Sequence, residues 1–147
     1  TTLFRSVVVW CSILWSFRWE WSEKELSSVT LTLSGLNLVW YTISLSDTYV
    51  KVLHSVQGKV IERKKTKVVK KSTSPVFNEA FVFDVREEDL RRSSISCEVH
   101  RGDTVLKTER IGHITLDLES FGTEVRQWND MITSPLKRVT ETHLLHA

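Results

Sequence analysis

The chain has few of the residues that mark disulfide-bonded, disordered or membrane-spanning proteins. Its 147 residues include two cysteines, two prolines and five glycines. Cys11 and Cys97 fit no CxxC metal or redox motif and are too few for a disulfide scaffold, so we expect reduced thiols in a cytosolic compartment. The scarcity of glycine and proline argues against low complexity and long disorder. The most apolar run, Val7–Phe17, is about half as long as the roughly 20 residues needed to cross a bilayer.

The sequence also lacks the motifs that carry catalysis or metal binding. It contains no GxSxG, P-loop or GxGxxG motif, and the acidic run Glu87-Glu88-Asp89 is typical of a solvated helix. None of the five histidines has the spacing of a metal site, and we expect all of them on the surface or in loops. They are His54, His100, His113, His143 and His146. The sequence therefore predicts a protein that is not an enzyme and that holds no cofactor.

The charge of the chain is small overall but unevenly distributed. The net charge is +2, yet the stretch Lys59–Lys71, called here the basic segment, holds seven basic residues and a single acid, Glu62. The remaining residues carry a net charge of −4. The basic residues of the segment are Lys59, Arg63, Lys64, Lys65, Lys67, Lys70 and Lys71. A concentrated positive stripe on a mildly acidic body predicts a local anionic partner.

The basic segment is rich in β-formers between its lysines, which predicts a strand. Alternation would place Lys59, Arg63, Lys65, Lys67 and Lys71 on one face of that strand and the other two lysines on the opposite face. A simpler alternative is a solvated edge strand whose lysines prevent edge-to-edge aggregation. Nucleic acid is a less favoured partner, because no aromatic residues interleave with the lysines and the body is acidic.

The dominant hydrophobic period is two, which predicts β-strands. From Val7 to Trp21 every second residue is apolar, which indicates one long strand or two strands with a bend. Seven or eight short strands separated by turn signals predict an all-β, eight-stranded antiparallel sandwich. Further strands are expected at Val29–Leu33, Tyr49–Leu53, Lys59–Lys71, Val76–Val85, Ile95–Val99 and Ile111–Leu118.

Two short helices interrupt the strand pattern. Arg86–Arg92 is charged, with Leu90 as its expected buried anchor. Glu124–Ile132 has Trp128 and Met131 on one apolar face at helical spacing. Pro135 follows and would end that helix.

Four stretches in the last hundred residues, in matching order, carry the motifs of one known family. They are Ser46–Val52, close to SDPYVKV; the polybasic Arg63–Thr66; Ser74–Phe83, close to NPVFNEAFVF; and Gln127–Met131 with Ser134-Pro135, close to HWxxM followed by NP. Together they resemble the second C2 domain of synaptotagmins. Residues 1–45 match poorly, so we divide the chain into a divergent N-terminal segment (1–28), which could supply the first strand, and a C2 domain (29–147). At the C-terminus, Thr142-His143-Leu144-Leu145 stands where relatives have WHxL, and we expect Leu145 to close the core.

The resemblance implies a calcium site at one end of the sandwich, and the sequence departs from it. Asp47 matches the second aspartate of the first loop, whereas no acid occurs at residues 39–42. The later loop has Arg101 where a bridging aspartate is usual, followed by Asp103 and then Glu109. A guanidinium repels the ion whose ligand it replaces, and Arg101 could pair with Asp47 or Asp103 instead. We expect a degenerate site that binds no calcium at physiological levels.

The resemblance also implies what the domain does. It predicts a calcium-independent module that binds acidic phospholipids or phosphoinositides in vesicle trafficking and exocytosis. Such a module acts on the cytoplasmic face of a vesicle or the plasma membrane, as a peripheral domain of a membrane-anchored protein. The alternatives are a protein-interaction module that meets SNARE proteins or a clathrin adaptor through the basic segment and, less favoured, a calcium sensor. Homo- or hetero-oligomers with other synaptotagmins are a further implied partnership. Trp40 and Tyr41, in the first loop, either dip into a membrane interface or pack on the sandwich end.

Overall fold

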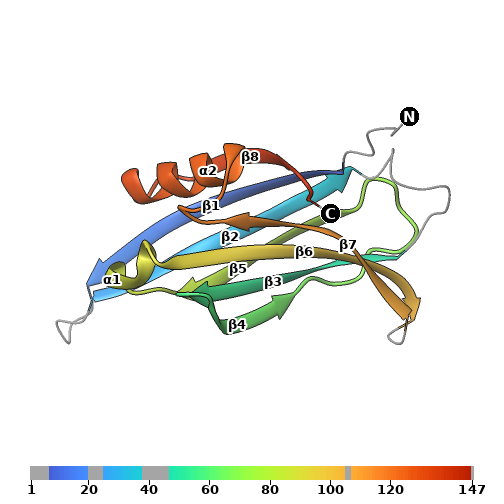
Figure 1. The fold of residues 1–147 in the computed structure, drawn as a ribbon, viewed down its shortest axis with the longest axis horizontal. Coiled ribbons are helices and arrows are strands. Elements are labelled where there is room, and N and C mark those ends of the chain that lie inside the picture. The colour runs from blue at the N-terminus through green and yellow to red at the C-terminus, as the bar shows by residue number, and fades with distance from the viewer. Residues whose placement is uncertain (1–6, 20–24, 38–46, 105–106, 147) are drawn as a thin grey trace.

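Two four-stranded antiparallel sheets face each other in the computed structural model, which describes residues 7–19, 25–37, 47–104 and 107–146 (Figure 1). One sheet has the strand order β5-β2-β1-β8 and the other β4-β3-β6-β7. The strands are β1 (Val8–Trp19), β2 (Glu25–Asn37), β3 (Thr48–Val56), β4 (Lys59–Lys65), β5 (Val76–Asp84), β6 (Ser93–Thr104), β7 (Lys107–Leu116) and β8 (Val139–Leu144). The helices are α1 (Glu87–Leu90) and α2 (Gly122–Thr133). The predicted eight-stranded sandwich is confirmed.

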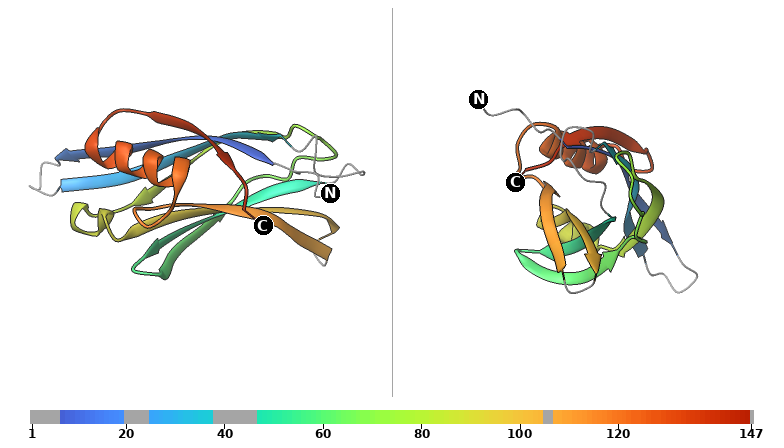
Figure 2. Two further views of the ribbon diagram at one scale, coloured as in Figure 1. Left: turned by 45° about the horizontal axis from the view of Figure 1, so that its top comes forward. Right: turned by 90° about the vertical axis from the view of Figure 1, so that its right-hand side faces the viewer.

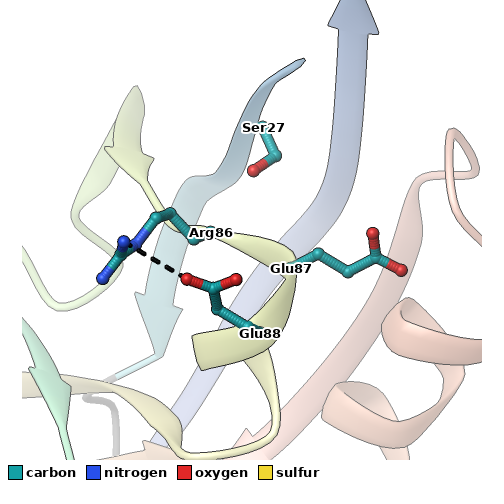
Figure 3. Close-up of a pocket in the computed structure, with 4 residues that line it drawn as sticks. All are labelled: Ser27, Arg86, Glu87 and Glu88. Atoms are coloured by element: carbon teal, nitrogen blue, oxygen red, sulfur yellow. Dashed lines mark ion pairs between the residues drawn. The ribbon is translucent and has the colours of Figure 1, made fainter. Parts of the chain in front are cut away.

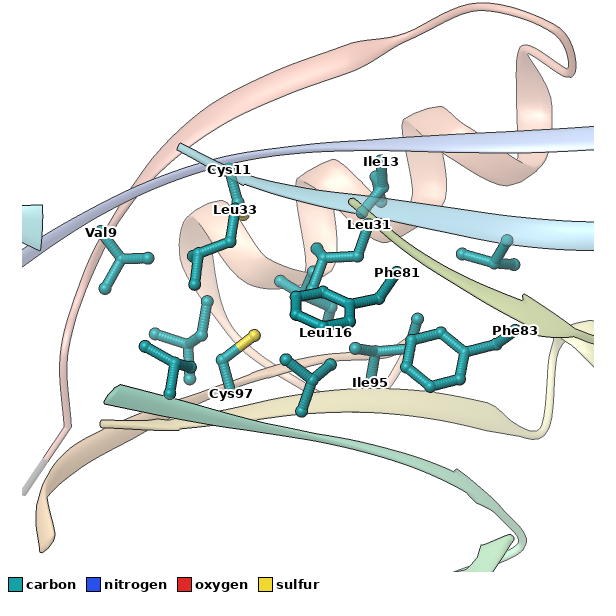
Figure 4. Packing of buried hydrophobic residues seen from close by; sticks show 14 of the residues in the cluster. Val9, Cys11, Ile13, Leu31, Leu33, Phe81, Phe83, Ile95, Cys97 and Leu116 are labelled. Atoms are coloured by element: carbon teal, nitrogen blue, oxygen red, sulfur yellow. The ribbon is translucent and has the colours of Figure 1, made fainter. Parts of the chain in front are cut away.

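The apolar run near the N-terminus forms a central strand rather than a membrane helix. β1 lies between β2 and β8 in its sheet, and its register with β2 shifts once, between Trp10 and Cys11. Alternate residues point into the sandwich, where Cys11 and Ile13 meet Leu31 and Leu33 of β2 (Figure 4). Neither helix in the described part of the chain is long and apolar enough to cross a membrane.

Both cysteines belong to this core. Cys11 is on β1 and Cys97 is on β6 of the opposing sheet, and both are buried and form no disulfide (Figure 4). Burial raises the pKa of Cys11 to about 12. The pKa of Cys97 is also raised well above its ordinary value, first by burial and then by the proximity of Cys11. Low dielectric surroundings disfavour the thiolate, so both groups act as small hydrophobic residues.

β3 and β4 form a tight hairpin that sets the position of the basic segment. Val56 pairs with Lys59 across the two-residue loop Gln57-Gly58, whose φ angles are 50° and 79°. Two successive positive φ values define the turn that best matches the twist of paired strands. This hairpin leaves β4 at the edge of its sheet.

The basic segment is not one continuous strand, which corrects the sequence prediction. β4 ends at Lys65 because Thr66 turns inward, where its Oγ1 accepts the N–H of Val50 at 3.0 Å and donates to the carbonyl of Lys67 at 2.8 Å. A hydroxyl that bonds local backbone in this way competes with ladder pairing. The chain then makes an isolated bridge between Val69 and Thr48 before β5 begins.

The helix α2 covers the open side of the sandwich between β8 and β1 of one sheet and β7 of the other (Figure 2). The predicted apolar face is confirmed, since Trp128 and Met131 are fully buried. Leu90 of α1 is buried as expected, and Leu145 packs against the core. The expectation of surface or loop histidines was wrong for three of the five, because His54, His100 and His143 are buried on strands.

A polar network not anticipated from the sequence fastens α2 to the sheets. His143 Nδ1 lies 2.8 Å from the hydroxyl of Thr123, and His143 Nε2 lies 2.6 Å from Oε1 of Gln127. The Gln127 amide nitrogen donates to the carbonyls of Cys11 and Val139 at 3.1 and 3.0 Å. Since an amide oxygen only accepts, Nε2 of His143 carries the proton and its Nδ1 accepts from Thr123. Each of these side chains therefore has a hydrogen-bond partner within the network.

Candidate functional site

The basic residues of the β3–β4 hairpin line a shallow groove on the outer face of their sheet. The groove has a volume of about 390 Å³. Lys51 lies opposite Lys65, and Leu53 lies opposite Arg63, in the β3–β4 register. We call this hollow the basic groove. The residues that line it are Lys51, Leu53, Arg63, Lys64, Lys65 and Glu98. Four cations and one carboxylate give the basic groove a net charge of +3. Like charges placed side by side repel each other, so an anionic ligand would stabilise the arrangement.

Lys64 differs from its neighbours because its ammonium group is used within the fold. Its Nζ donates to the carbonyl of Val82 on β5 at 2.6 Å and pairs with Glu62 at 3.3 Å. The same nitrogen lies 5.0 Å from the centre of the Phe83 ring, in cation–π range. Lys64 thus links the edge strands of the two sheets and is less free than Lys65 to meet a ligand.

The other predicted basic residues extend the positive surface to both ends of β4. The alternation predicted for Lys59, Arg63 and Lys65 on one face and Lys64 on the other is found in β4. Lys59 is exposed beside the hairpin turn, about 20 Å of strand from Lys65. Beyond the end of β4, the exposed residues Lys67, Lys70 and Lys71 follow an irregular path toward the start of β3.

Sequence reasoning missed Lys51, which the structure places in the middle of the basic groove. The signal was present, because Lys51 alternates with the buried Val50 and Val52 on a strand and must therefore point outward. The pairing register that sets Lys51 beside Lys65 is not visible in the sequence. Glu98 of β6 was also missed, and it faces Lys51 from the other side.

The residues matched to the calcium loops gather at one end of the sandwich, on three neighbouring strands. Arg101 on β6 pairs in register with Thr48 of β3 and with Glu109 of β7, and the N–H of Gly102 donates to the carbonyl of Asp47 at 3.1 Å. The guanidinium of Arg101 donates from Nε and Nη2 to one oxygen of Glu109, at 3.0 and 2.9 Å. Asp47 Oδ1 accepts the backbone N–H of Lys71 at 3.2 Å.

Among the described carboxylates, Arg101 binds Glu109 rather than the expected Asp47, and the expected pairing with Asp103 stays a prediction. The side chain of Asp103 lies outside the described residues, as do Trp40 and Tyr41. Within the described part of the chain, no cluster of three or more histidine, cysteine or acidic side chains could hold a metal ion. The pairings of Arg101 and Asp47 use carboxylate oxygens that a hard cation would need as ligands.

A second hollow of about 400 Å³ lies at the opposite end, beside α1 (Figure 3). It is lined by Ser27, Arg86, Glu87 and Glu88. Arg86 pairs with Glu88 at 3.2 Å and with Asp89 at 3.3 Å, and Ser27 donates its hydroxyl to the carbonyl of Val85. The one cation of this hollow is therefore neutralised within the fold, so the basic groove is the stronger candidate site.

These features define a class of protein. It is an antiparallel β-sandwich with a basic groove on the outer face of one sheet and the Arg101–Glu109 ion pair at one end. The C2 domain family model matches residues 26–131. The chain belongs to the C2 domain family, whose members are binding modules rather than enzymes.

Proteins similar to this chain include several synaptotagmins. Human synaptotagmin-7 is 40% identical over 102 residues, which are 69% of this chain and 25% of that protein. Human synaptotagmin-2 is 38% identical over 101 residues, 69% of this chain and 24% of that protein. The chain therefore spans about a quarter of the length of the curated relatives it matches.

Solved structures confirm the fold at low sequence identity. A C2 domain of RIM from Drosophila aligns with a TM-score of 0.68 and 14% identity, covering 96% of this chain and 98% of that one. The first C2 domain of human synaptotagmin XIII aligns with a TM-score of 0.63 and 15% identity, covering 99% of this chain and 90% of that one. Both alignments extend over nearly the whole chain, the N-terminal strands included.

Proposed function

We propose that this C2 domain binds acidic phospholipids, phosphoinositides among them, through the basic groove and without calcium. The observation that carries the proposal is the side-by-side placement of Lys51, Arg63 and Lys65 on an outward sheet face. Polyvalent phosphate headgroups suit such a cluster, since Arg can bind two oxygens at once and Lys adds point charges. Lys59, Lys67, Lys70 and Lys71 would meet the surrounding anionic surface.

The expected affinity is modest. Each basic residue close to an anionic leaflet contributes about 1 kcal/mol, and the basic segment has a net charge of +6. Roughly 6 kcal/mol corresponds to a dissociation constant of tens of micromolar. Salt weakens such binding, because the groups are exposed. A second domain or a membrane anchor in the same protein would make it durable, which fits a role in vesicle trafficking and exocytosis at the cytoplasmic face of a membrane.

Calcium independence is supported by the loop end of the sandwich. Arg101 brings a fixed positive charge to the position where the family usually has a calcium ligand. Its guanidinium also donates hydrogen bonds to Glu109, so this carboxylate is already paired. Asp47 is held by the backbone of Lys71. A divalent cation would have to displace both interactions and approach a guanidinium.

Liposome co-sedimentation tests this proposal. Arg63→Ala/Lys65→Ala should reduce binding to vesicles that contain acidic lipid by about 30-fold if each charge contributes about 1 kcal/mol. The matched control is Lys137→Ala/Arg138→Ala, which removes the same charge from exposed positions after α2. Chelating calcium should leave vesicle binding by the wild type and by both double variants unchanged. Equal loss in the two double variants would show that only net charge matters, and binding that requires calcium would refute the proposal.

A second candidate is an acidic protein partner, such as a SNARE assembly or an adaptor, on the same hairpin. Ile61 is 56% exposed on the outward face of β4, and Leu53 lines the basic groove. Apolar side chains between cations suit a peptide that alternates acidic and apolar residues. Binding in pull-down without lipid, lost on Ile61→Ser but retained by Lys137→Ala/Arg138→Ala, would favour this candidate.

A further inference from the structure

Four short stretches of the chain share one arrangement, in which two adjacent basic residues are followed, after one further residue, by serine or threonine. They are Arg63–Thr66, Lys70–Thr73, Arg91–Ser94 and Lys137–Thr140. Protein kinases that prefer basic substrates bind such pairs through carboxylates in the groove that holds the peptide. This groove takes the peptide in extended form, so the acceptor must be exposed and outside a paired strand. The sequence does not distinguish the four hydroxyl groups, whereas the structure does.

Three of the four hydroxyl groups are buried or lie on paired strands. Thr66 is 4% exposed, and its hydroxyl makes two hydrogen bonds to the backbone. Ser94 is half-buried on β6, which lies between β3 and β7. Thr140 is exposed, but it belongs to β8 and pairs with Ser12 of β1. A kinase would have to disrupt the packing or the strand pairing before any of these residues could enter its groove.

Thr73 lies in a loop outside both sheets. Residues 70–74 connect two fixed points. One is Val69, bridged to Thr48 by hydrogen bonds of 2.9 and 2.8 Å, and the other is Pro75, whose carbonyl accepts an N–H of β2 at 3.0 Å. The segment passes the end of the sandwich between β4 and β5 (Figure 1). Thr73 and both lysines of its motif are exposed. Of the four stretches, this one can enter a kinase groove without loss of strand pairing.

The loop can extend at little cost. Its interior is held by the N–H of Lys71, which donates to Asp47 at 3.2 Å, and by the N–H of Ser74, which donates to the hydroxyl of Ser72 at 3.1 Å. Both hydrogen bonds are exposed, and exposed hydrogen bonds open easily. Lys71 also has a φ of 43°, a left-handed value that is unfavourable for a residue with a side chain. Extension of the loop would relieve this conformation.

The two hydroxyl groups beside Thr73 are less suitable acceptors. Ser72 is half-buried, and its hydroxyl accepts the N–H of Ser74 in a local turn. Ser74 precedes Pro75, which is buried, so a kinase that requires proline after the acceptor could not bind this residue. Thr73 combines exposure with lysines two and three positions before it.

We propose that Thr73 is a phosphorylation site for a serine/threonine kinase that prefers basic substrates. The reaction transfers the γ-phosphoryl group of ATP to the Thr73 hydroxyl and releases ADP and a proton. The new phosphate carries about −1.5 to −2 charges at neutral pH. Thr73 is at most about 7 Å of chain from Lys71 and about 11 Å from Lys70. The phosphate can therefore pair with both ammonium groups.

The functional consequence rests on the proposed lipid binding. The phosphate would cancel part of the +6 net charge of the basic segment. A loss of this size corresponds to roughly 10- to 30-fold weaker binding to an anionic surface. The basic groove on β3 and β4 keeps its own cations, so phosphorylation should reduce lipid binding without abolishing it.

Phosphate incorporation, mapped by mass spectrometry, tests the site. The probe is the catalytic subunit of cyclic-AMP-dependent protein kinase with ATP, acting on the folded full chain. It should add one phosphate, at Thr73. Thr73→Val should prevent this, whereas Thr140→Val, the matched control at an exposed threonine with the same motif, should not. Circular dichroism checks that both variants fold. A chain that takes up no phosphate, or takes it up first at Thr66, Ser94 or Thr140, overturns the proposal.

Peptides test whether the fold selects the site. Synthetic peptides that span each of the four stretches lack the strands and the core, so the same kinase should phosphorylate all four at comparable rates. A kinase that modifies the Thr73 peptide alone would show that local sequence, not exposure, makes the choice, and this would refute the structural argument.

Co-sedimentation with vesicles of phosphatidylcholine and phosphatidylserine separates this inference from the proposed function. The phosphorylated wild type should bind roughly 10- to 30-fold more weakly than the unmodified chain. Kinase-treated Thr73→Val should bind like the unmodified chain. If Thr73 is phosphorylated but the unmodified chain does not bind the vesicles, the lipid proposal fails and the modification site stands. Equal binding by the phosphorylated and unmodified chains would refute control of lipid binding by this phosphate.

Discussion

The guanidinium of Arg101 binds Glu109 across β6 and β7, with Nε and Nη2 at 3.0 and 2.9 Å from the same carboxylate oxygen. The Arg101 side chain is 23% exposed, whereas that of Glu109 is 61% exposed. The pair therefore sits half-buried at the end of the sandwich where the resemblance implies a calcium site. We propose that Arg101 stands there in place of a ligand.

We predict that Arg101 is the residue that opposes calcium binding. Calorimetric titration of the wild type should show no binding in the roughly 10⁻⁷–10⁻⁵ M range of calcium sensors. Arg101→Asp should raise calcium affinity measurably, because it removes the cation and adds a third carboxylate beside Asp47 and Glu109. Arg101→Gln, which removes the charge but adds no anion, should have a smaller effect. Heat of binding from the wild type would contradict this.

Replacing Lys64 by alanine should mainly lower stability, whereas replacing Lys65 should mainly weaken vesicle binding. Lys64→Ala removes a hydrogen bond to Val82 and a cation–π contact with Phe83, so it should lower the free energy of unfolding by about 1 kcal/mol. Lys65→Ala should leave stability nearly unchanged and weaken binding to acidic vesicles instead. Urea denaturation and co-sedimentation of both variants measure the two effects. Equal effects on vesicle binding would mean that Lys64 reaches the ligand despite its internal contacts.

Acidification should destabilise the chain through His143. Burial, assisted by the positive charges of Arg126 and His146 and opposed by Glu141, lowers the pKa of His143 to about 4. The unfolded chain takes up this proton near pH 6.5, but the folded chain does so only near pH 4. The stabilising contribution is therefore complete above pH 6.5 and is lost as pH falls toward 4, by up to about 3 kcal/mol.

Urea denaturation between pH 4 and 8 measures this loss. His143→Asn should be less stable at pH 7.5, since it breaks the network with Thr123 and Gln127, yet it should lose less stability on acidification. His54 and His113, whose pKa values burial also lowers, remain in both proteins and affect both curves alike. Parallel curves for the two proteins would rule out His143 as the source.

A methyl group at Gly112 should loosen the C-terminal end of the chain. A Cβ there would lie 2.5 Å from the carbonyl oxygen of His146 and 2.8 Å from Leu145 Cδ2. The backbone of His146 is held close by reciprocal hydrogen bonds with His113, at 2.8 and 2.9 Å. Gly112→Ala should therefore cost about 1–3 kcal/mol of stability, as overpacking does. Thermal denaturation measures this change.

A double-mutant cycle shows whether the cost at Gly112 comes from this contact. In a chain truncated after Leu144, the clashing atoms are gone, so Gly112→Ala should be nearly neutral. A similar cost in both backgrounds would place the strain elsewhere on β7.

The fold was predictable because its signals are local. Period-two alternation identified β1 as a strand, and the spacing of Trp128 and Met131 identified the buried face of α2. The end of β4 was not predictable, because it depends on Thr66 bonding to Val50, which is 16 residues away in the chain.

The candidate site was predictable only in part, for the same physical reason. The excess of lysine and arginine is visible in the sequence, but their grouping depends on register. Lys51 joins the basic groove through its pairing with Lys65, whereas Lys64 is turned toward Val82 of the other sheet. Likewise, His143 is buried because α2 delivers Gln127 and Thr123 to it. Contacts between distant segments decide these details.

The two buried thiols have a practical consequence for studying this domain. Cys11 and Cys97 are the only cysteines of the chain, and burial keeps both protonated at neutral pH. Maleimide reagents attack exposed thiolates, so the native fold should remain unlabelled. A single cysteine introduced at an exposed position such as Ile61 or Val68 would then carry a fluorophore or spin label selectively. The core itself thus supplies a silent background for spectroscopy.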